Sequence, residues 1–239
     1  MNHACKAVRP GRAFKRRLQD LMTTVERDNR RVRLNLEARA DLEWWFQFGL
    51  NWNGVSLMRS LAATDSPQET MLSDASGNWG CGATWNGKWF QLSWNEAKGA
   101  TGWSIMPKEL LPIVVAAVVW KEHWRCKVVK TRCDNMAVVA TVKSGTCKEK
   151  AAMHLIRCLA FVEATVPMTI VTEHIRGVDN AVADALSRDR LDVARSIMQD
   201  PAGETEQIPV GLVELLTTDD HSWTGQEWRR LQHFCSTKV

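Results

Sequence analysis

The segment from residue 70 to residue 94 constrains the fold most, because it has the pattern of three short strands in antiparallel succession. Glycines separate the first run, 70–76, from the second, 81–86, and the pair Asn86-Gly87 leads from the second into the third, 88–94. Asn-Gly is favoured in two-residue hairpin turns, since both positions of the turn need a positive φ. We therefore expect a three-stranded meander at the start of a β-sheet.

After the meander, helical and strand patterns alternate along the chain. Apolar residues at helical spacing predict helices, and alternating residues predict strands. The helices are expected near 107–124, 137–143, 148–164 and 181–188, and the strands near 127–134 and 166–174. Pro107 suits the entrance of a helix, whereas Pro112 lacks an amide hydrogen and is expected near the first turn or at a kink. This order of elements predicts a mixed α/β sheet.

The first 62 residues carry the basic excess of a chain whose net charge is +4. Helical patterns cover Phe14–Val25, with Lys15, Arg16 and Arg17 on the polar side, and the aromatic-rich Leu36–Phe48. The basic residues either contact phosphates or form a solvated face, and the aromatic helix either stacks on bases or packs on a neighbouring domain. We expect three parts: a basic helical extension at 1–62, an α/β domain at 63–190, and an acidic tail with a short helix at 191–239.

Composition argues against a membrane or secreted protein. No apolar run reaches the roughly 18 residues that a membrane span needs, and the N-terminal residues lack the pattern of a signal peptide. The seven cysteines are odd in number and form no C-x-x-C pair, which favours reduced thiols over a disulfide framework or a zinc site. We therefore expect an intracellular protein, cytoplasmic or nuclear, with no membrane partner.

Four acidic residues occupy positions where α/β sheets build sites. Asp74 and Asp134 stand at the ends of predicted strands, Glu109 on the first turn of a predicted helix, and Asp184 on a later helix. Each one alone is more simply explained as a turn cap or a surface charge. Together they would need a counterion, and two Mg²⁺ ions about 4 Å apart serve phosphodiester cleavage by activating water and stabilising the leaving oxygen. We expect two Mg²⁺ here, with Mn²⁺ as a substitute.

The motifs around these acids resemble, in order, those of the ribonuclease H fold. They are Asp74-x-Ser-Gly-Asn-x-Gly-x-Gly82, Lys108-Glu109-Leu110, Cys133-Asp134-Asn135, and His174 followed by Asn180-Ala-Val-Ala-Asp-Ala-Leu-Ser-Arg188. The resemblance is strongest to the ribonuclease H domain of reverse transcriptases from DIRS-like, tyrosine-recombinase retrotransposons. It covers roughly residues 70–190 through these motifs, and the Ala-Asp-Ala-Leu-Ser-Arg ending is characteristic of retroelements.

The resemblance implies a ribonuclease H-like mixed five-stranded sheet flanked by helices, and hydrolysis of the RNA strand of RNA–DNA hybrids. It implies that Asp74 bridges both metal ions while Glu109, Asp134 and Asp184 complete their shells. A histidine at the position of His174 assists proton movement or product release in that family.

The resemblance also implies the partners of the chain. The turn Ala75, Ser76, Gly77 and Asn78, together with Asn135 and Asn180, would contact the RNA–DNA hybrid. This turn is shorter than in cellular enzymes, which commonly have glycine at the position of Ala75. Residues 13–60 look like the segment that follows a polymerase palm, so an upstream polymerase domain of the same element is a further expected partner.

Two other signals do not support a competing function. Gly77-x-x-Gly80-x-Gly82 leads into a strand rather than a helix, so it is not a dinucleotide loop. Asp219-Asp220 lacks the aromatic strand-turn setting of a polymerase. An integrase or transposase nuclease is disfavoured because its glutamate usually comes last, whereas Glu109 is the second acid. A non-catalytic nucleic-acid-binding or assembly module derived from a retroelement remains the open alternative.

Overall fold

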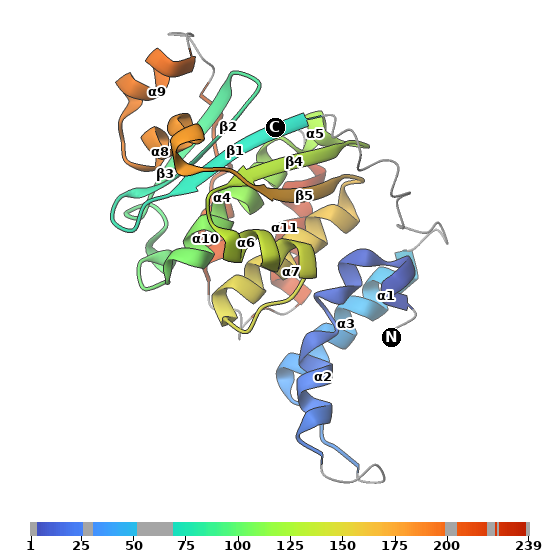
Figure 1. Ribbon diagram of the computed structural model, residues 1–239. Coiled ribbons are helices and arrows are strands. Elements are labelled where there is room, and N and C mark those ends of the chain that lie inside the picture. The colour runs from blue at the N-terminus through green and yellow to red at the C-terminus, as the bar shows by residue number, and fades with distance from the viewer. Residues whose placement is uncertain are drawn as a thin grey trace.

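A mixed five-stranded sheet forms the centre of the molecule (Figure 1). The computed structural model describes residues 4–25, 31–51, 69–198, 205–218, 223 and 225–237. The strands lie in the order β3-β2-β1-β4-β5. Their bounds are β1 Glu69–Ala75, β2 Gly80–Trp85, β3 Lys88–Ser93, β4 Val128–Cys133 and β5 Thr169–His174. With helices on both faces, this sheet confirms the predicted ribonuclease H-like α/β fold.

The first three strands form the expected antiparallel meander. β1 pairs with β2 and β2 with β3, and the register places Trp85 opposite Lys88 across the second turn. The two turn residues, Asn86 and Gly87, have φ values of 51° and 77°. Both positive values confirm that the Asn-Gly pair makes the hairpin turn.

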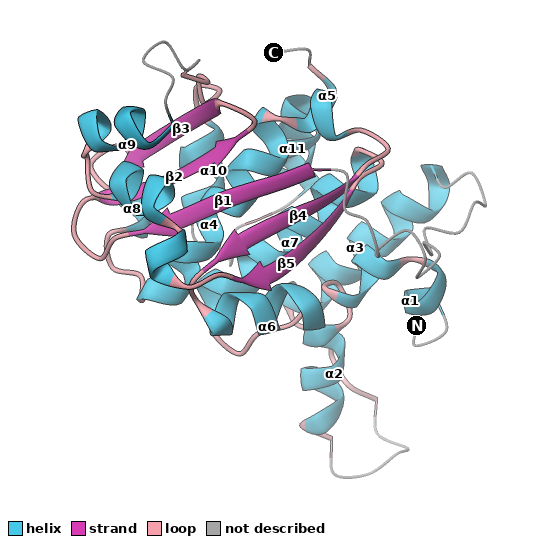
Figure 2. Cartoon of the chain, turned by 45° about the horizontal axis from the view of Figure 1, so that its top comes forward, coloured by secondary structure: helices cyan, strands magenta, loops and turns pink. Residues whose placement is uncertain are grey.

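Helices cover the two faces of the sheet unequally (Figure 2). On one face, α4 (Ile105–Val119) packs on β1 and β2, with α7 (Lys150–Thr165) beside it, and α6 (Met136–Ser144) packs on β5. On the other face, α8 (Ala181–Ser187) lies over β1, β2 and β3, and α9 (Leu191–Met198) packs against α8. The main hydrophobic core lies on the face that α4 and α7 cover. On the opposite face, α8 lies at the end of the sheet where the predicted acids are found.

Helix α4 is buried almost all round, and it differs from the sequence prediction in three respects. The helix begins at Ile105, after Ser104, so Glu109 lies on its second turn and not on the first. Pro112 lies on the third turn, where it leaves the carbonyl of Lys108 without its usual helical partner. The helix ends at Val119, and the predicted continuation is a separate short helix, α5 (Lys121–Trp124).

The C-terminal segment is part of the main core and holds more than the one short helix that was expected. Helices α10 (Leu212–Thr217) and α11 (Gly225–Ser236) pack on the outer side of α4 and α7. Their apolar side chains are buried in the same cluster as those of α4, among them Leu212, Leu216, Trp228 and Leu231. These helices therefore bury the second side of α4, and this cover is why α4 has no polar face.

The N-terminal extension also packs on this core. It comprises α1 (Ala4–Ala7), the 3₁₀ turn η1 (Arg9–Arg12), α2 (Arg16–Thr23) and α3 (Leu36–Asn51). The ring of Phe14 stacks on Trp44 with centroids 4.0 Å apart and meets the edge of Trp228 at 5.4 Å. Trp44 of the aromatic helix is thus buried and joined through Phe14 to the main core, whereas Phe46 of the same helix is 68% exposed. The expected boundary at residues 62 and 63 lies outside the described residues.

A buried ion pair joins the extension to α7. Asp41 of α3 is 1% exposed, and its Oδ1 lies 3.6 Å from Arg17 Nη1 and 3.6 Å from Arg157 Nε. Arg157 belongs to α7 and is itself 2% exposed. Loss of one member of a buried pair leaves the other charge without its partner in a region that water does not reach.

All seven cysteines are free thiols, and five of them are buried, as expected for cysteines that serve as small apolar residues. Within the described ranges, no helix combines the length and the apolar character that crossing a membrane requires.

Asp41→Ala should lower the free energy of unfolding by about 3 kcal/mol, because it leaves the Arg157 guanidinium buried without its carboxylate. Chemical denaturation followed by tryptophan fluorescence measures the change. Arg39→Ala, at an exposed position of the same helix, is the matched control. Equal stability of the two variants would show that the pair does not hold the extension in place.

Candidate active site

Three of the four predicted acids meet at one edge of the sheet. Asp74, Glu109 and Asp134 each offer a carboxylate oxygen, and these oxygens all lie within 4.8 Å of one another. Asp74 and Glu109 are buried, at 5% and 4% exposed, whereas Asp134 is exposed. The acidic group is therefore shielded from solvent at Asp74 and Glu109 and open to solvent at Asp134.

The pairing of the two parallel strands explains why Asp74 and Asp134 are neighbours. The register places Leu72 of β1 opposite Arg132 of β4. Asp74 and Asp134 each follow two residues later, so both reach the same edge of the sheet. Glu109 joins them from α4, which crosses beneath β1 and β2. Three of the four acids that the sequence analysis singled out therefore lie together, two from strand ends and one from a helix.

Burial and like charge act together on Glu109. Its pKa is raised to about 9, first by burial and then by the charges of Asp74 and Asp134, and only a backbone hydrogen bond from Ala75 opposes this. Within the described part of the chain, the Oε2 atom of Glu109 is buried without a hydrogen-bond partner. At neutral pH the side chain therefore holds a proton as long as no cation neutralises the group.

Ser187 is a site residue that the sequence analysis did not single out. It is fully buried on α8, and its Oγ donates a hydrogen bond of 2.5 Å to Asp74 Oδ2. The pKa of Asp74 is raised, mainly by burial, and this hydrogen bond opposes the rise without cancelling it. Ser187 follows Asp184 by three residues, so a helical reading of the Ala-Asp-Ala-Leu-Ser-Arg motif would have placed both on one face. Ser187 fixes the orientation of the Asp74 carboxylate.

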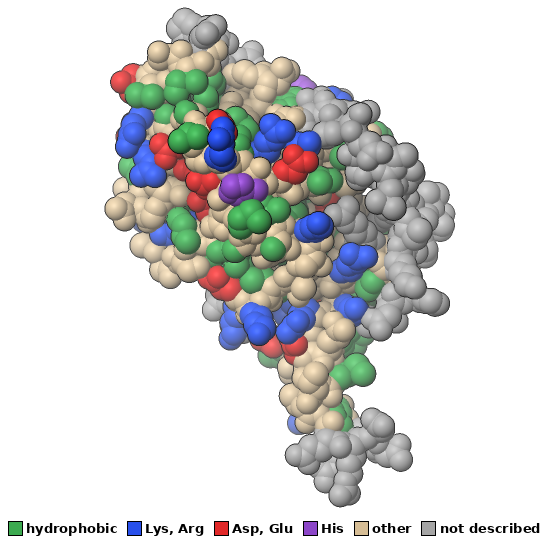
Figure 3. All heavy atoms as spheres, in the orientation of Figure 1, with side chains coloured by type: hydrophobic (Ala, Val, Ile, Leu, Met, Phe, Trp, Pro, Cys, Tyr) green, Lys and Arg blue, Asp and Glu red, His purple; other side chains and the backbone are tan. Residues whose placement is uncertain are grey.

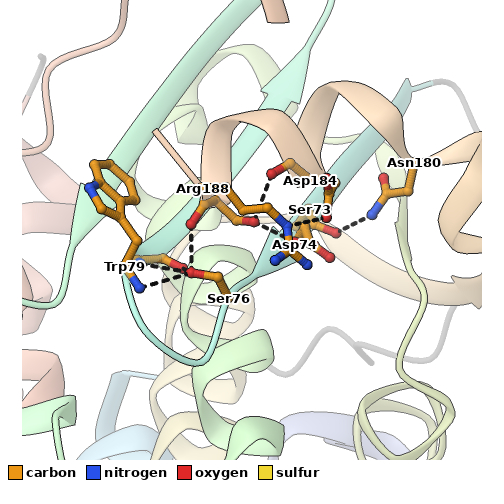
Figure 4. A network of polar contacts seen from close by, with 9 residues as sticks. Ser73, Asp74, Ser76, Trp79, Asn180, Asp184 and Arg188 are labelled. Atoms are coloured by element: carbon orange, nitrogen blue, oxygen red, sulfur yellow. Dashed lines mark hydrogen bonds and ion pairs between the residues drawn. The ribbon is translucent and has the colours of Figure 1, made fainter. Parts of the chain in front are cut away.

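Asp184 lies near the group of three but is held by its own helix. Its Oδ1 accepts a hydrogen bond of 2.6 Å from Arg188 Nε (Figure 4). Its charge raises the pKa of Asp74, so the two carboxylates affect each other. The structure thus brings Asp184 to the same end of the sheet, while the close cluster contains only Asp74, Glu109 and Asp134.

His174 is the last residue of β5 and is exposed. The register pairs it with Cys133, the residue before Asp134. The predicted histidine therefore lies one strand away from the acidic group, at the same edge of the sheet.

The turn after β1 differs from the predicted substrate contact in two of its four residues. Ala75 and Ser76 are buried. Ser76 Oγ donates to the carbonyl of Ser187 at 2.7 Å and accepts the N–H of Trp79 and of Gly80, so it ties the turn to α8 (Figure 4). A ligand cannot reach these two side chains. The exposed residues of the turn are Gly77 and Asn78.

The two predicted asparagines have separate roles. Asn135 caps α6, since its Oδ1 accepts the N–H of Ala137 at 3.0 Å, and its side chain is half-buried. Asn180 is 0% exposed and its Nδ2 donates to the carbonyl of Ser73 at 2.9 Å. The expectation that Asn180 contacts the substrate is therefore wrong in this structure, because its side chain links α8 to β1 beneath the surface.

One glycine of the first motif is explained by packing and not by the turn. A Cβ atom at Gly82 would lie 2.5 Å from Cβ of Leu186 on α8. Glycine at this position lets α8 approach β2 closely enough for Ser187 to reach Asp74.

The acidic group is suited to hold a metal ion. All of its ligand atoms are carboxylate oxygens, which hard divalent cations prefer. The charge of Arg188 acts on Asp74, but the raised pKa of Glu109 and its unpartnered, buried Oε2 show that this charge does not offset the repulsion at Glu109. A divalent cation would neutralise the repulsion among the carboxylates.

Comparisons with models of protein families and with curated proteins find no match to this chain.

Without metal, the free energy of unfolding should fall as the pH rises from about 4.5 towards about 9. The unfolded chain releases the Glu109 proton in this interval while the folded chain retains it, so rising pH favours the unfolded state. Glu109→Gln removes this titration and should flatten the pH dependence. Urea denaturation at several pH values in the presence of a chelator measures it. Glu214→Gln, at an exposed position, should leave the slope as in the wild type.

Mg²⁺ or Mn²⁺ should raise the melting temperature of the wild type, because an ion that binds only the folded state stabilises it. Asp74→Asn removes the ligand that Ser187 orients and should abolish most of the increase. Asp192→Asn, at an exposed position of α9, is the control with the same change of charge. An equal increase for both variants would contradict a metal site at the acidic group.

Proposed function

We propose that this chain is the ribonuclease H domain of a retroelement reverse transcriptase, and that it hydrolyses the RNA strand of RNA–DNA hybrids with Mg²⁺. The observation that carries the proposal is the cluster of Asp74, Glu109 and Asp134, whose carboxylate oxygens lie within 4.8 Å at the carboxyl edge of a ribonuclease H-like sheet. The order of the sequence motifs, with the Ala-Asp-Ala-Leu-Ser-Arg ending, supports the same family.

The metal-holding residues in this proposal are Asp74, Glu109 and Asp134, with Asp184 joining them for a second ion. When bound, two Mg²⁺ ions would supply Lewis-acid stabilisation of the phosphate and a more acidic water. Asp184 must first leave the guanidinium of Arg188, which it contacts at 2.6 Å. Glu109 must release its proton before both of its oxygens act as ligands.

The other residues of the site orient these groups and move protons. Ser187 holds Asp74 in a single orientation through a buried hydrogen bond. His174, exposed one strand from Asp134, is placed to exchange a proton with solvent or with the leaving group. The exposed Gly77 and Asn78 present the first turn to the sugar-phosphate backbone, where the 2′-hydroxyl distinguishes RNA from DNA.

The proposed context of this domain is a longer retroelement polyprotein, with a polymerase domain upstream, in the cytoplasm or the nucleus. The support for an upstream polymerase domain is the resemblance of residues 13–60 to the segment that follows a polymerase palm.

One observation favours the alternative of a non-catalytic nucleic-acid-binding module. Asp184 is engaged by Arg188 and lies outside the close cluster of three carboxylates. If Asp184 stayed paired with Arg188, the site would hold at most an incomplete metal centre, and the protein would bind a hybrid without cleaving it.

Purified protein should cleave the RNA of a labelled RNA–DNA hybrid in Mg²⁺ and leave duplex DNA and duplex RNA uncut. Asp134→Asn should lower the rate at least about 100-fold, because it removes a charged ligand while the exposed position tolerates the change. Asp192→Asn is the control. Binding of the hybrid by the wild type without cleavage would overturn the enzyme and support the non-catalytic module.

A further inference from the structure

A groove lies between the N-terminal extension and the end of α6. Arg12, Lys15 and Arg16 line one side, and Ser144 and Thr146 line the other, around a cavity of about 350 Å³. None of these residues belongs to the acidic site, and the proposed reaction gives them no role.

The backbone of the α6–α7 loop shapes this groove. Gly145 ends α6 with φ 67°, a left-handed conformation that favours glycine. This turn carries the loop towards the extension, so that a Cβ at Gly145 would lie 3.7 Å from Cβ of Arg12. The Oγ1 atom of Thr146 is buried there without a hydrogen-bond partner among the described residues. The loop thus forms one wall of the groove, opposite the guanidinium and ammonium groups of the extension.

The charge around the groove is strongly positive. Three exposed lysines, Lys143, Lys148 and Lys150, belong to the end of α6, the loop and the start of α7. Figure 3 shows a row of Lys and Arg side chains on this face, above the projecting α2. Of the two nearest acids in sequence, Asp20 pairs with Arg16 of the groove itself at 2.9 Å and offsets part of its charge. Glu149 accepts a hydrogen bond from Ser104 at 2.7 Å.

Helix α6 sets the distance between this groove and the acidic site. The helix begins directly after Asp134 and Asn135, and it ends at Ser144 beside the groove. Nine helical residues span about 13 Å at 1.5 Å per residue. Since each strand of a nucleic acid duplex carries one phosphate per roughly 3.4 Å of axis, this length corresponds to about four base pairs. The groove therefore lies within one helical turn of a duplex from the acidic site, which is close enough for one duplex to reach both.

We propose that this groove binds the phosphodiester backbone of the duplex that occupies the acidic site, and so acts as a second, sequence-independent contact. Lys and Arg side chains neutralise backbone phosphates without reading the base sequence. The extension supplies half of the contact, and the loop after α6 supplies the other half. The identity of the duplex as an RNA–DNA hybrid rests on the proposed function, whereas the recognition of a backbone does not.

The test measures binding apart from catalysis. Affinity for a 20-base-pair RNA–DNA hybrid and for duplex DNA of the same length is measured by fluorescence anisotropy across a range of salt concentrations, on the Asp134→Asn background in a chelator. Three double variants, equal in net charge, are compared. They are Arg12→Gln with Arg16→Gln, Lys143→Gln with Lys148→Gln, and the control Arg229→Gln with Arg230→Gln on the exposed side of α11.

Each groove variant should bind both duplexes roughly 10-fold or more weakly at 0.1 M salt, and should flatten the slope of log K against log salt by about 2, since two phosphate contacts are lost. The control should match its parent. The lysine variant changes only exposed side chains, so a loss of affinity there without a change in melting temperature excludes misfolding.

The outcomes separate this proposal from the proposed function. If the wild type cleaves the hybrid but the groove variants bind like the control, the groove proposal falls while the function stands. If no cleavage occurs yet both groove variants lose affinity for the duplexes, the groove proposal stands while the function falls. Polyglutamate that displaces the hybrid as readily as unlabelled duplex would overturn a nucleic acid as the occupant.

Discussion

The parallel pairing of β1 with β4 is the contact on which the site depends. It brings together two strands that are far apart in sequence, and its register decides that Asp74 and Asp134 end at the same level. A shift of one residue would turn every side chain of a strand to the opposite face. Helix α4 then adds Glu109 from one side, and α8 adds Ser187 from the other. The geometry of the acids is thus a property of the sheet and not of any single loop.

The site also shows a conflict between stability and function. Two buried carboxylates and an exposed one face each other, and burial together with like charge raises the pKa of Glu109 to about 9. Such a group opposes folding at neutral pH, and the surrounding core offsets it through the apolar helix α4 and its two covering layers. A cluster of carboxylates that destabilises the folded chain until a cation neutralises it is typical of cation-binding sites.

Local patterns in the sequence were enough to predict the five strands, most helices and the three clustered acids. The Asn86-Gly87 turn and the acids at strand ends follow from rules that involve only neighbouring residues. Features that depend on packing between distant segments could not be predicted this way. The burial of Asn180 and Ser76, the hydrogen bond from Ser187 to Asp74, and the second layer that makes α4 apolar all round arise when α8, α10 and α11 dock. The start of α4 at Ile105, ahead of Pro107, likewise moved Glu109 by one turn.

The contact between Phe14 and Trp228 has a consequence for the way the chain folds during synthesis. The two rings come from opposite ends of the chain, and Trp228 also lies against Phe161 of α7 and Trp223. A nascent chain that has released the sheet but not α11 from the ribosome would expose the apolar outer side of α4 and α7. Contacts of such high sequence separation slow folding and prolong this exposure. The last helix therefore completes the core, and premature termination before it would yield an aggregation-prone chain with its acidic residues intact.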